Sequence, residues 1–118
     1  MTDWKGPWDG TVYPELIQTM PEVDVPFDGV RGWLLSSTDK QIVFFDIEPV
    51  GKVPPHAHCA QWGVVLEGEM SLTIGEETKV YRKGDWYHIP ADVIHSAEFH
   101  SRVNVIDVFD AADRWKAK

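Results

Sequence analysis

Hydrophobic and polar residues alternate in short stretches along most of the chain, and turn-forming residues separate these stretches. In residues 70–74, for example, Met70, Leu72 and Ile74 alternate with smaller polar residues. Such alternation is typical of a strand with one buried face, because successive side chains on a strand point to opposite sides. The stretch therefore predicts a half-buried β-strand.

The same pattern recurs from residue 30 onwards. Glycine, proline and clusters of polar residues lie between the stretches, and residues 67–69 form the turn of a predicted hairpin. Many short, evenly spaced strands of this kind indicate an all-β sandwich or barrel. The predicted strands cover residues 30–35, 41–47, 61–66, 70–74, 78–81, 85–89, 95–99 and 103–109.

The chain divides into three parts. Residues 1–29 form an irregular arm, because four prolines interrupt any regular element, yet the arm carries Trp4, Trp8 and Tyr13. Side chains this apolar are expected to pack on the chain's own barrel or on that of a partner. The barrel itself is predicted for 30–110, and 111–118 is predicted to be a short tail or helix.

Composition narrows the class of protein. A length of 118 residues predicts one domain, and the single Cys59 cannot form an internal disulfide, which fits a reducing cytoplasm. The start of the sequence lacks the basic and apolar regions of a secretion signal, and no stretch approaches the ~18 apolar residues of a membrane helix. A net charge of −8 argues against nucleic acid as a partner.

Two histidines one residue apart, His56 and His58, are the first candidates for chemistry. They follow Pro54 and Pro55, and an apolar stretch comes shortly after them, so the flanking residues favour a strand over a helix. On a strand, this spacing directs both imidazoles into one space. Imidazole nitrogen suits zinc, iron, nickel, copper and, less strongly, manganese.

Two stretches of the sequence resemble the two motifs of the cupin superfamily. His56, His58, Gln61 and Gly68 fill the first motif, G-x5-H-x-H-x3-4-E-x6-G. The second motif, G-x5-P-x-G-x2-H-x3-N, is filled by Gly84, Pro90, Asp92 and His95. The resemblance covers roughly residues 30–109. It implies a double-stranded β-helix, also called a jelly-roll or cupin barrel, and one divalent transition metal ion (Zn, Fe, Ni or Mn) held by His56, His58, Gln61 and His95.

The sequence departs from these motifs at several positions. Gly51 lies one residue too close to His56, and His58 and Gln61 are separated by one residue fewer than usual. Glutamine replaces the glutamate of the first motif. Asp92 replaces the glycine of the second motif, and Phe99 replaces its closing asparagine. An amide oxygen is a weaker ligand than a carboxylate, so Gln61 is expected to be the weakest of the four.

Strand parity places further residues around the proposed site. If Gln61 points inward, so do Gly63 and Val65, and Phe99 forms a wall of the pocket because it shares the face of His95. Tyr87 and His88 are candidates for a general acid or base, and at most one of them faces the cavity. Two other side chains are candidates for a role at the site. Cys59 offers a redox or metal-binding thiol, and Arg31 either anchors a substrate carboxylate or forms a surface ion pair.

Three functions are compatible with these residues. The first is a metal-dependent enzyme that acts on a small organic molecule, as a dioxygenase, isomerase or lyase. The second is a small-molecule or sugar-binding module without turnover, and the third is a fold that has lost its metal. The expected partners are a small-molecule ligand and a second copy of the chain in a homodimer, because the apolar arm has no obvious place inside a filled barrel.

Overall fold

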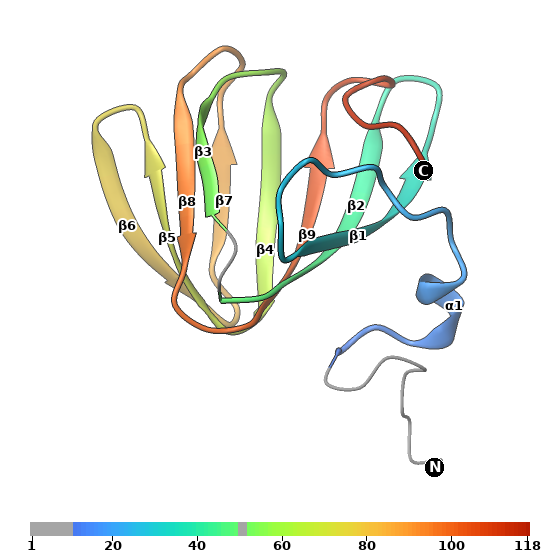
Figure 1. Ribbon diagram of the computed structural model, residues 1–118. Helices are drawn as coiled ribbons and strands as arrows, with labels where there is room; N and C mark the ends of the chain where they lie inside the picture. Colours follow the sequence, from blue (N-terminus) through green and yellow to red (C-terminus); the bar gives the residue numbers. More distant parts are fainter. Residues whose placement is uncertain (1–10, 50–51) are drawn as a thin grey trace.

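The computed structural model describes residues 11–49 and 52–118, and most of this part is β-structure (Figure 1). Nine strands in these ranges form two antiparallel sheets whose inner faces enclose one hydrophobic core. This confirms the predicted fold class, an all-β jelly-roll barrel. The arm's first ten residues and Gly51 of the first motif lie outside the described ranges.

Each sheet combines strands that are distant in the sequence. The five-stranded sheet has the order β1 (Val30–Ser36), β2 (Gln41–Ile47), β9 (Val103–Phe109), β4 (Gln61–Glu67) and β7 (Trp86–Ile89). The four-stranded sheet has the order β3 (Lys52–His56), β8 (His95–Phe99), β5 (Glu69–Ile74) and β6 (Glu77–Arg82). The helix α1 (Glu15–Gln18) is a single turn, and no helix in the described ranges is long and apolar enough to cross a membrane.

Strand parity decides which side chains enter the core. On β4, Gly63 and Val65 are buried and Trp62 is exposed, as the alternation predicts. Burying a large apolar side chain contributes roughly 1.5–3 kcal/mol, so these inward rows supply most of the driving force for closing the barrel. The strands are therefore held in a register in which slipping by one residue would expose the core.

The hairpin from β4 to β5 turns at Gly68, which has a backbone φ of 92°. A side chain there would also meet the carbonyl oxygen of Arg102. Both the left-handed backbone and the close approach require glycine.

The described part of the arm packs on both sides of the five-stranded sheet: Val23 joins the core, Val25 and Phe27 line the cavity, and Tyr13 lies on the outer face. The Tyr13 ring meets Trp33 and Phe44 edge-on, with ring centroids 5.9 and 5.8 Å apart. Its hydroxyl donates to the carbonyl oxygens of Phe45 and Val105, at 2.8 and 2.9 Å. Tyr13 is thereby 2% exposed, so the chain's own barrel holds this part of the arm.

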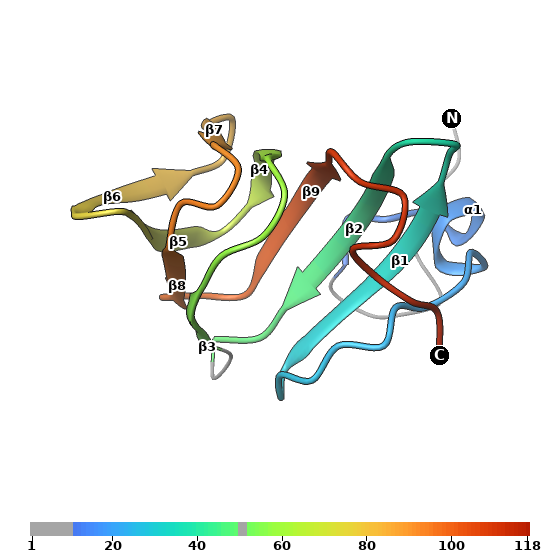
Figure 2. The same cartoon turned by 90° about the horizontal axis from the view of Figure 1, so that it is seen from above.

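The C-terminal tail runs from the end of β9 across β2 and β1 (Figure 2). Gln41 fixes it by accepting from the Trp115 backbone N–H at 2.8 Å and donating to the Trp115 carbonyl at 2.9 Å. The Trp115 ring packs edge-on against Phe45 and Phe109. Residues 110–118 contain no helix, and these contacts bring Arg114 and Trp115 into the wall of the barrel cavity.

Candidate metal centre

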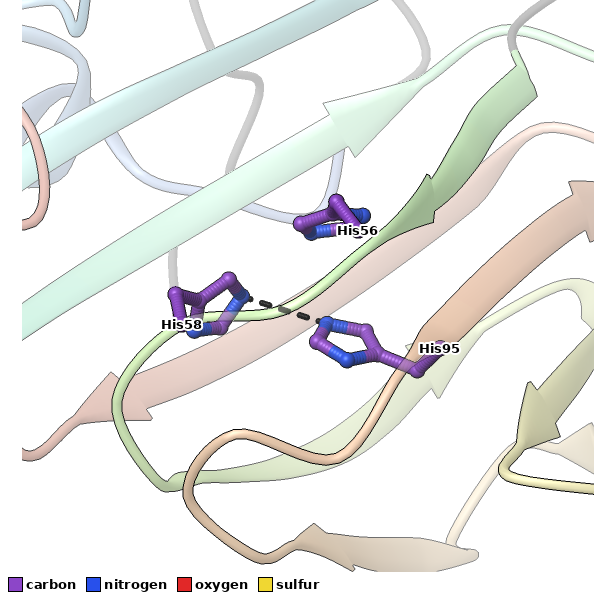
Figure 3. A group of neighbouring side chains, drawn as sticks. All are labelled: His56, His58 and His95. Carbon is purple, nitrogen blue, oxygen red and sulfur yellow. Dashed lines mark hydrogen bonds between the residues drawn. The ribbon is translucent and has the colours of Figure 1, made fainter.

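Three histidines that line the cavity between the sheets converge on one another (Figure 3). His56 is the last residue of β3, and its register partner His95 is the first residue of β8. His58 lies beyond the strand, in the loop that leads to β4, so the expected placement of both motif-one histidines on one strand differs from the structure. The three potential ligand atoms nevertheless lie within 4.8 Å of one another.

The backbone sets the tautomer of all three rings. The Nδ1 atoms of His56, His58 and His95 lie 2.8, 2.8 and 2.9 Å from carbonyl oxygens. A carbonyl oxygen only accepts hydrogen bonds, so each Nδ1 carries the proton and donates. Each Nε2 is left with a free lone pair, which is the arrangement found in histidines that bind metals.

The donor set fits a divalent ion. The Nε2 atoms of His58 and His95 are 3.1 Å apart, and with both Nδ1 atoms protonated their lone pairs repel each other. Two imidazole nitrogens bound to one ion at about 2.0–2.1 Å lie about 3 Å apart when they occupy neighbouring positions. A cation between these atoms would replace the repulsion with two coordinate bonds.

Burial keeps His58 and His95 neutral. Desolvation is the main cause that lowers the pKa of His58 from 6.5 to about 4, and it also lowers the pKa of His95. The nearby positive charge of Arg114 adds to both shifts. Protons therefore compete weakly for these rings at neutral pH, which favours a metal ion as their partner.

A turn between β7 and β8 ties the two motifs together. Asp92 has a backbone φ of 65°, in the left-handed region that glycine adopts freely and aspartate tolerates. This explains why Asp92 can occupy the position of the glycine in the second motif. Its backbone N–H donates to the carbonyl of His58 at 2.9 Å, which fixes the loop that carries this histidine.

Gln61, the expected fourth ligand, begins β4 and lines the same cavity. Its side chain hydrogen-bonds the carboxylate of Asp107, which only its amide N–H groups can do. The amide oxygen is not used by this bond. Coordination by Gln61 stays a prediction.

Asp107 is one of two charged residues of the cavity that were not predicted from the sequence. It lies on β9, is 4% exposed and accepts a 2.6 Å hydrogen bond from the Tyr87 hydroxyl. Desolvation raises its pKa from 3.8 to about 6, although the bonds from Tyr87 and Gln61 partly oppose this shift. The result is a buried carboxylate that can exchange a proton near neutral pH.

The two acid–base candidates separate as parity requires. Tyr87 is 4% exposed and lines the cavity, whereas His88 lies on the outer face of the sheet opposite Trp62. Burial, followed by the charge of Asp107, raises the Tyr87 pKa well above its usual value, so the phenol remains a hydrogen-bond donor. A methyl group on Gly63 would overlap both Tyr87 and Asp107, so this pair occupies the space that a larger residue would need.

The remaining side chains differ in how close they lie to the three histidines. Arg31 pairs with Glu22 at 2.7 Å, with 42% of the arginine side chain exposed. Cys59 is a free, partly buried thiol, and burial raises its pKa. Phe99 lines the cavity, as predicted from its position on the strand of His95. Arg114, which the sequence analysis did not single out, also lines it and stacks on Trp115, with Cζ 4.1 Å from the ring centroid.

Comparison with known proteins places this geometry in a family. A family model described as "Cupin domain" matches residues 43–109. The chain is 31% identical over 83 residues to the H2HPP isomerase of Bacillus subtilis, a match that covers 69% of this chain and 35% of that protein. The chain thus spans about a third of that relative's length.

Solved structures agree with this assignment. An RmlC-like cupin from Shewanella frigidimarina superposes with a TM-score of 0.72 and 25% identity, over 80% of this chain and 86% of the other. KdgF from Halomonas sp. superposes with a TM-score of 0.68 and 22% identity, over 78% and 86%. With the matching family model and the converging histidines, these similarities show that the chain belongs to the cupin family.

Proposed function

We propose that this protein is a metal-dependent enzyme of the isomerase type, which moves a proton within a small organic molecule. One observation carries the proposal: the three Nε2 atoms and the buried Asp107 carboxylate belong to the same cavity. A cation site beside a titratable carboxylate combines stabilisation of negative charge with a group that takes up a proton.

The chemistry that a divalent ion supplies when bound is Lewis-acid polarisation of a substrate oxygen. His56, His58 and His95 would hold the ion, and Gln61 is the predicted fourth ligand. Asp107 would accept a proton from the carbon next to the polarised carbonyl. The C–H bond would break and its electron pair would move toward the carbonyl oxygen. In a substrate whose enolate is conjugated with a C=C bond, the electron pair would then flow back, the double bond would shift, and Asp107 would return the proton to the far carbon of that bond.

Two neighbours prepare Asp107 for this role. Tyr87 donates to one carboxylate oxygen at 2.6 Å and Gln61 also hydrogen-bonds the group, so its orientation is fixed before the substrate arrives. The pKa of about 6 lies close to neutral pH, where a general base is most effective. The identity with an H2HPP isomerase supports this class of reaction over the dioxygenase and lyase alternatives.

Exchange of substrate protons with solvent deuterium tests the proposal. Phenylpyruvate and 2-oxobutanoate, which carry acidic protons next to a carbonyl, are incubated in D2O with protein loaded with zinc, iron(II), nickel or manganese(II). Loss of the proton signal is followed by NMR. We expect metal-dependent exchange that is faster than buffer, because Asp107 provides a positioned base.

Other outcomes assign other functions. Metal-dependent oxygen uptake without proton exchange, in iron(II)-loaded protein, would favour a dioxygenase. A melting shift with a sugar or organic acid, with neither exchange nor oxygen uptake, would favour the binding module. Exchange that is equally fast in protein treated with chelator would contradict the metal-dependent mechanism.

We also propose that two copies form an isologous homodimer through the outer face of the five-stranded sheet. One cross-strand row there consists of Trp33, Phe44, Ile106, Val64 and Trp86, of which Tyr13 of the same chain covers Trp33 and Phe44. The next row consists of Leu35, Ile42, Val108, Trp62 and His88. Trp86 is 63% exposed and Trp62 39% exposed. Neither row contains a carboxylate, so two chains of net charge −8 could meet here without burying like charges.

Sedimentation at micromolar concentration checks this assembly. The parent protein is expected to sediment as a dimer, and Trp62→Glu is expected to sediment as a monomer because it places a charge in the apolar contact. Removal of residues 1–12 is expected to weaken the dimer. A parent protein that sediments only as a 13.4 kDa monomer would contradict the proposal.

A further inference from the structure

We infer that Arg114, together with the indole of Trp115, forms a subsite for a carboxylate group of the substrate. The inference rests on the proposed function, because it assigns a substrate class, small organic acids, to the same cavity. It concerns a part of the chain outside the two cupin motifs, the irregular tail that follows β9.

Arg114 is a charged side chain that pairs with no carboxylate of the described residues. Its guanidinium lines the cavity, and burial lowers its pKa, although arginine remains protonated at neutral pH. No ion pair or hydrogen bond to this guanidinium occurs within residues 11–49 and 52–118.

Two buried N–H groups of the tail have no acceptor in the part of the chain that the structure describes. They are Nε of Arg114 and Nε1 of Trp115, on consecutive residues whose side chains both line the cavity. Leaving a buried donor unpaired costs about 1–3 kcal/mol, and more for a charged group. A ligand that carries a hydrogen-bond acceptor would satisfy both donors when it binds, which explains why they lie together without a partner.

Backbone hydrogen bonds of the tail fix the positions of these two donors. Gln41 bonds the Trp115 backbone on both sides, and the Asp24 N–H donates to the carbonyl of Lys116 at 2.8 Å. Arg114 is stacked on the Trp115 ring. A binding group with a fixed orientation loses little conformational entropy when a ligand arrives.

Charge and size select the ligand. The three neutral histidines with a divalent ion, and the Arg114 guanidinium, give two positive centres that border one cavity. The cavity has a volume of about 80 Å³ and mostly apolar walls. Pockets for drug-sized ligands measure about 300–1,000 Å³. A compact molecule with a carboxylate for Arg114 and a neighbouring oxygen for the ion fits these features, and a planar guanidinium suits a carboxylate.

Binding of matched probes tests the subsite. Glycolate and its neutral isostere glycolamide are titrated into metal-free and zinc-loaded protein, and binding is followed by protein NMR shifts. We expect the parent to prefer glycolate by at least tenfold in both forms. Arg114→Gln is expected to lower glycolate affinity about 10- to 100-fold, while glycolamide affinity and zinc stoichiometry remain unchanged.

Two further variants sharpen the comparison. Arg114→Lys keeps the charge but loses the planar fork, so its glycolate affinity should fall between those of the parent and Arg114→Gln. Arg82→Gln is the matched control, because Arg82 is exposed and pairs with Glu69 on β5, outside the cavity. Its glycolate affinity should equal that of the parent.

Three results would overturn the inference. They are equal glycolate affinity in the parent and Arg114→Gln, no preference of the parent for glycolate over glycolamide, and tighter Arg114-dependent binding of inorganic phosphate than of glycolate. The proposed function fails separately: Arg114-dependent glycolate binding without metal-dependent proton exchange would refute the isomerase alone. Proton exchange with unchanged glycolate binding in Arg114→Gln would refute the subsite alone.

Discussion

His58→Ala is expected to lower the affinity for zinc by at least about two orders of magnitude, because it removes one of three imidazole ligands and a coordinate bond. His56→Ala and His95→Ala should behave alike, since all three rings present Nε2 to the same point. The affinities are measured by titration against a chelating dye. His88→Ala is the matched control, because His88 lies exposed on the outer face of the sheet.

Gln61 is expected to rank below the histidines. Gln61→Ala should weaken metal binding less, because water can replace an amide oxygen. Gln61→Glu should strengthen it, because a carboxylate adds the charge that three neutral imidazoles lack. Retention of one equivalent of zinc by His56→Ala and His95→Ala, as tightly as by the parent, would show that these histidines do not form a metal site.

Asp107→Asn is expected to abolish most of the catalysis and to stabilise the fold at the same time. Removing the base should slow metal-dependent proton exchange by at least about 100-fold. The pKa of Asp107 rises from 3.8 in the unfolded chain to about 6 in the folded protein. A pKa shift of about 2 units corresponds to about 3 kcal/mol. Above pH 6, the buried charge of Asp107 lowers the free energy of unfolding by this amount.

The sign of the stability effect depends on pH. The folded state binds the Asp107 proton more tightly than the unfolded state, so the stabilisation is fully present below about pH 4 and is lost as the pH rises through 6. Asparagine cannot ionise, and it keeps an oxygen that accepts from Tyr87. The free energy of unfolding of metal-free Asp107→Asn should therefore exceed that of the parent by about 1–3 kcal/mol at pH 7.5 and match it at pH 4.

Urea denaturation of both proteins at the two pH values provides the measurement. His58 and His95, whose pKa is lowered, have the opposite effect on stability. Their contribution to the free energy of unfolding decreases as the pH falls below 6.5, because the unfolded state then binds protons more readily than the folded state. They are present in both proteins, so the difference isolates Asp107. A variant that is less stable than the parent at pH 7.5 would contradict the account of a costly buried charge.

Local patterns predicted the parts of the fold that depend on alternation. The inward positions of Gly63 and Val65 and the exposed position of Trp62 follow from strand parity alone. The convergence of His56, His58 and His95 was predicted from motif spacing, although His58 reaches the site from a loop because β3 ends at His56. The motif spacing therefore predicted the metal-binding residues more reliably than the expectation that His56 and His58 share one strand.

The two overlooked residues differ in how far sequence could have revealed them. Asp107 shares a strand face with Val103, Val105 and Phe109, so parity marks it as a carboxylate in an apolar row. That signal was present in the alternation. Arg114 follows no periodicity, because its position depends on side-chain contacts between the tail and β2, which are distant in sequence.

The central claim is that one divalent ion binds to the Nε2 atoms of His56, His58 and His95, in the cavity that Asp107 lines. Anomalous diffraction from crystals of zinc-loaded protein, collected at the zinc edge, tests it most directly. The account predicts a single strong peak at about 2.0–2.1 Å from all three Nε2 atoms. A peak elsewhere on the protein, or coordination by fewer than three of these histidines, would contradict it.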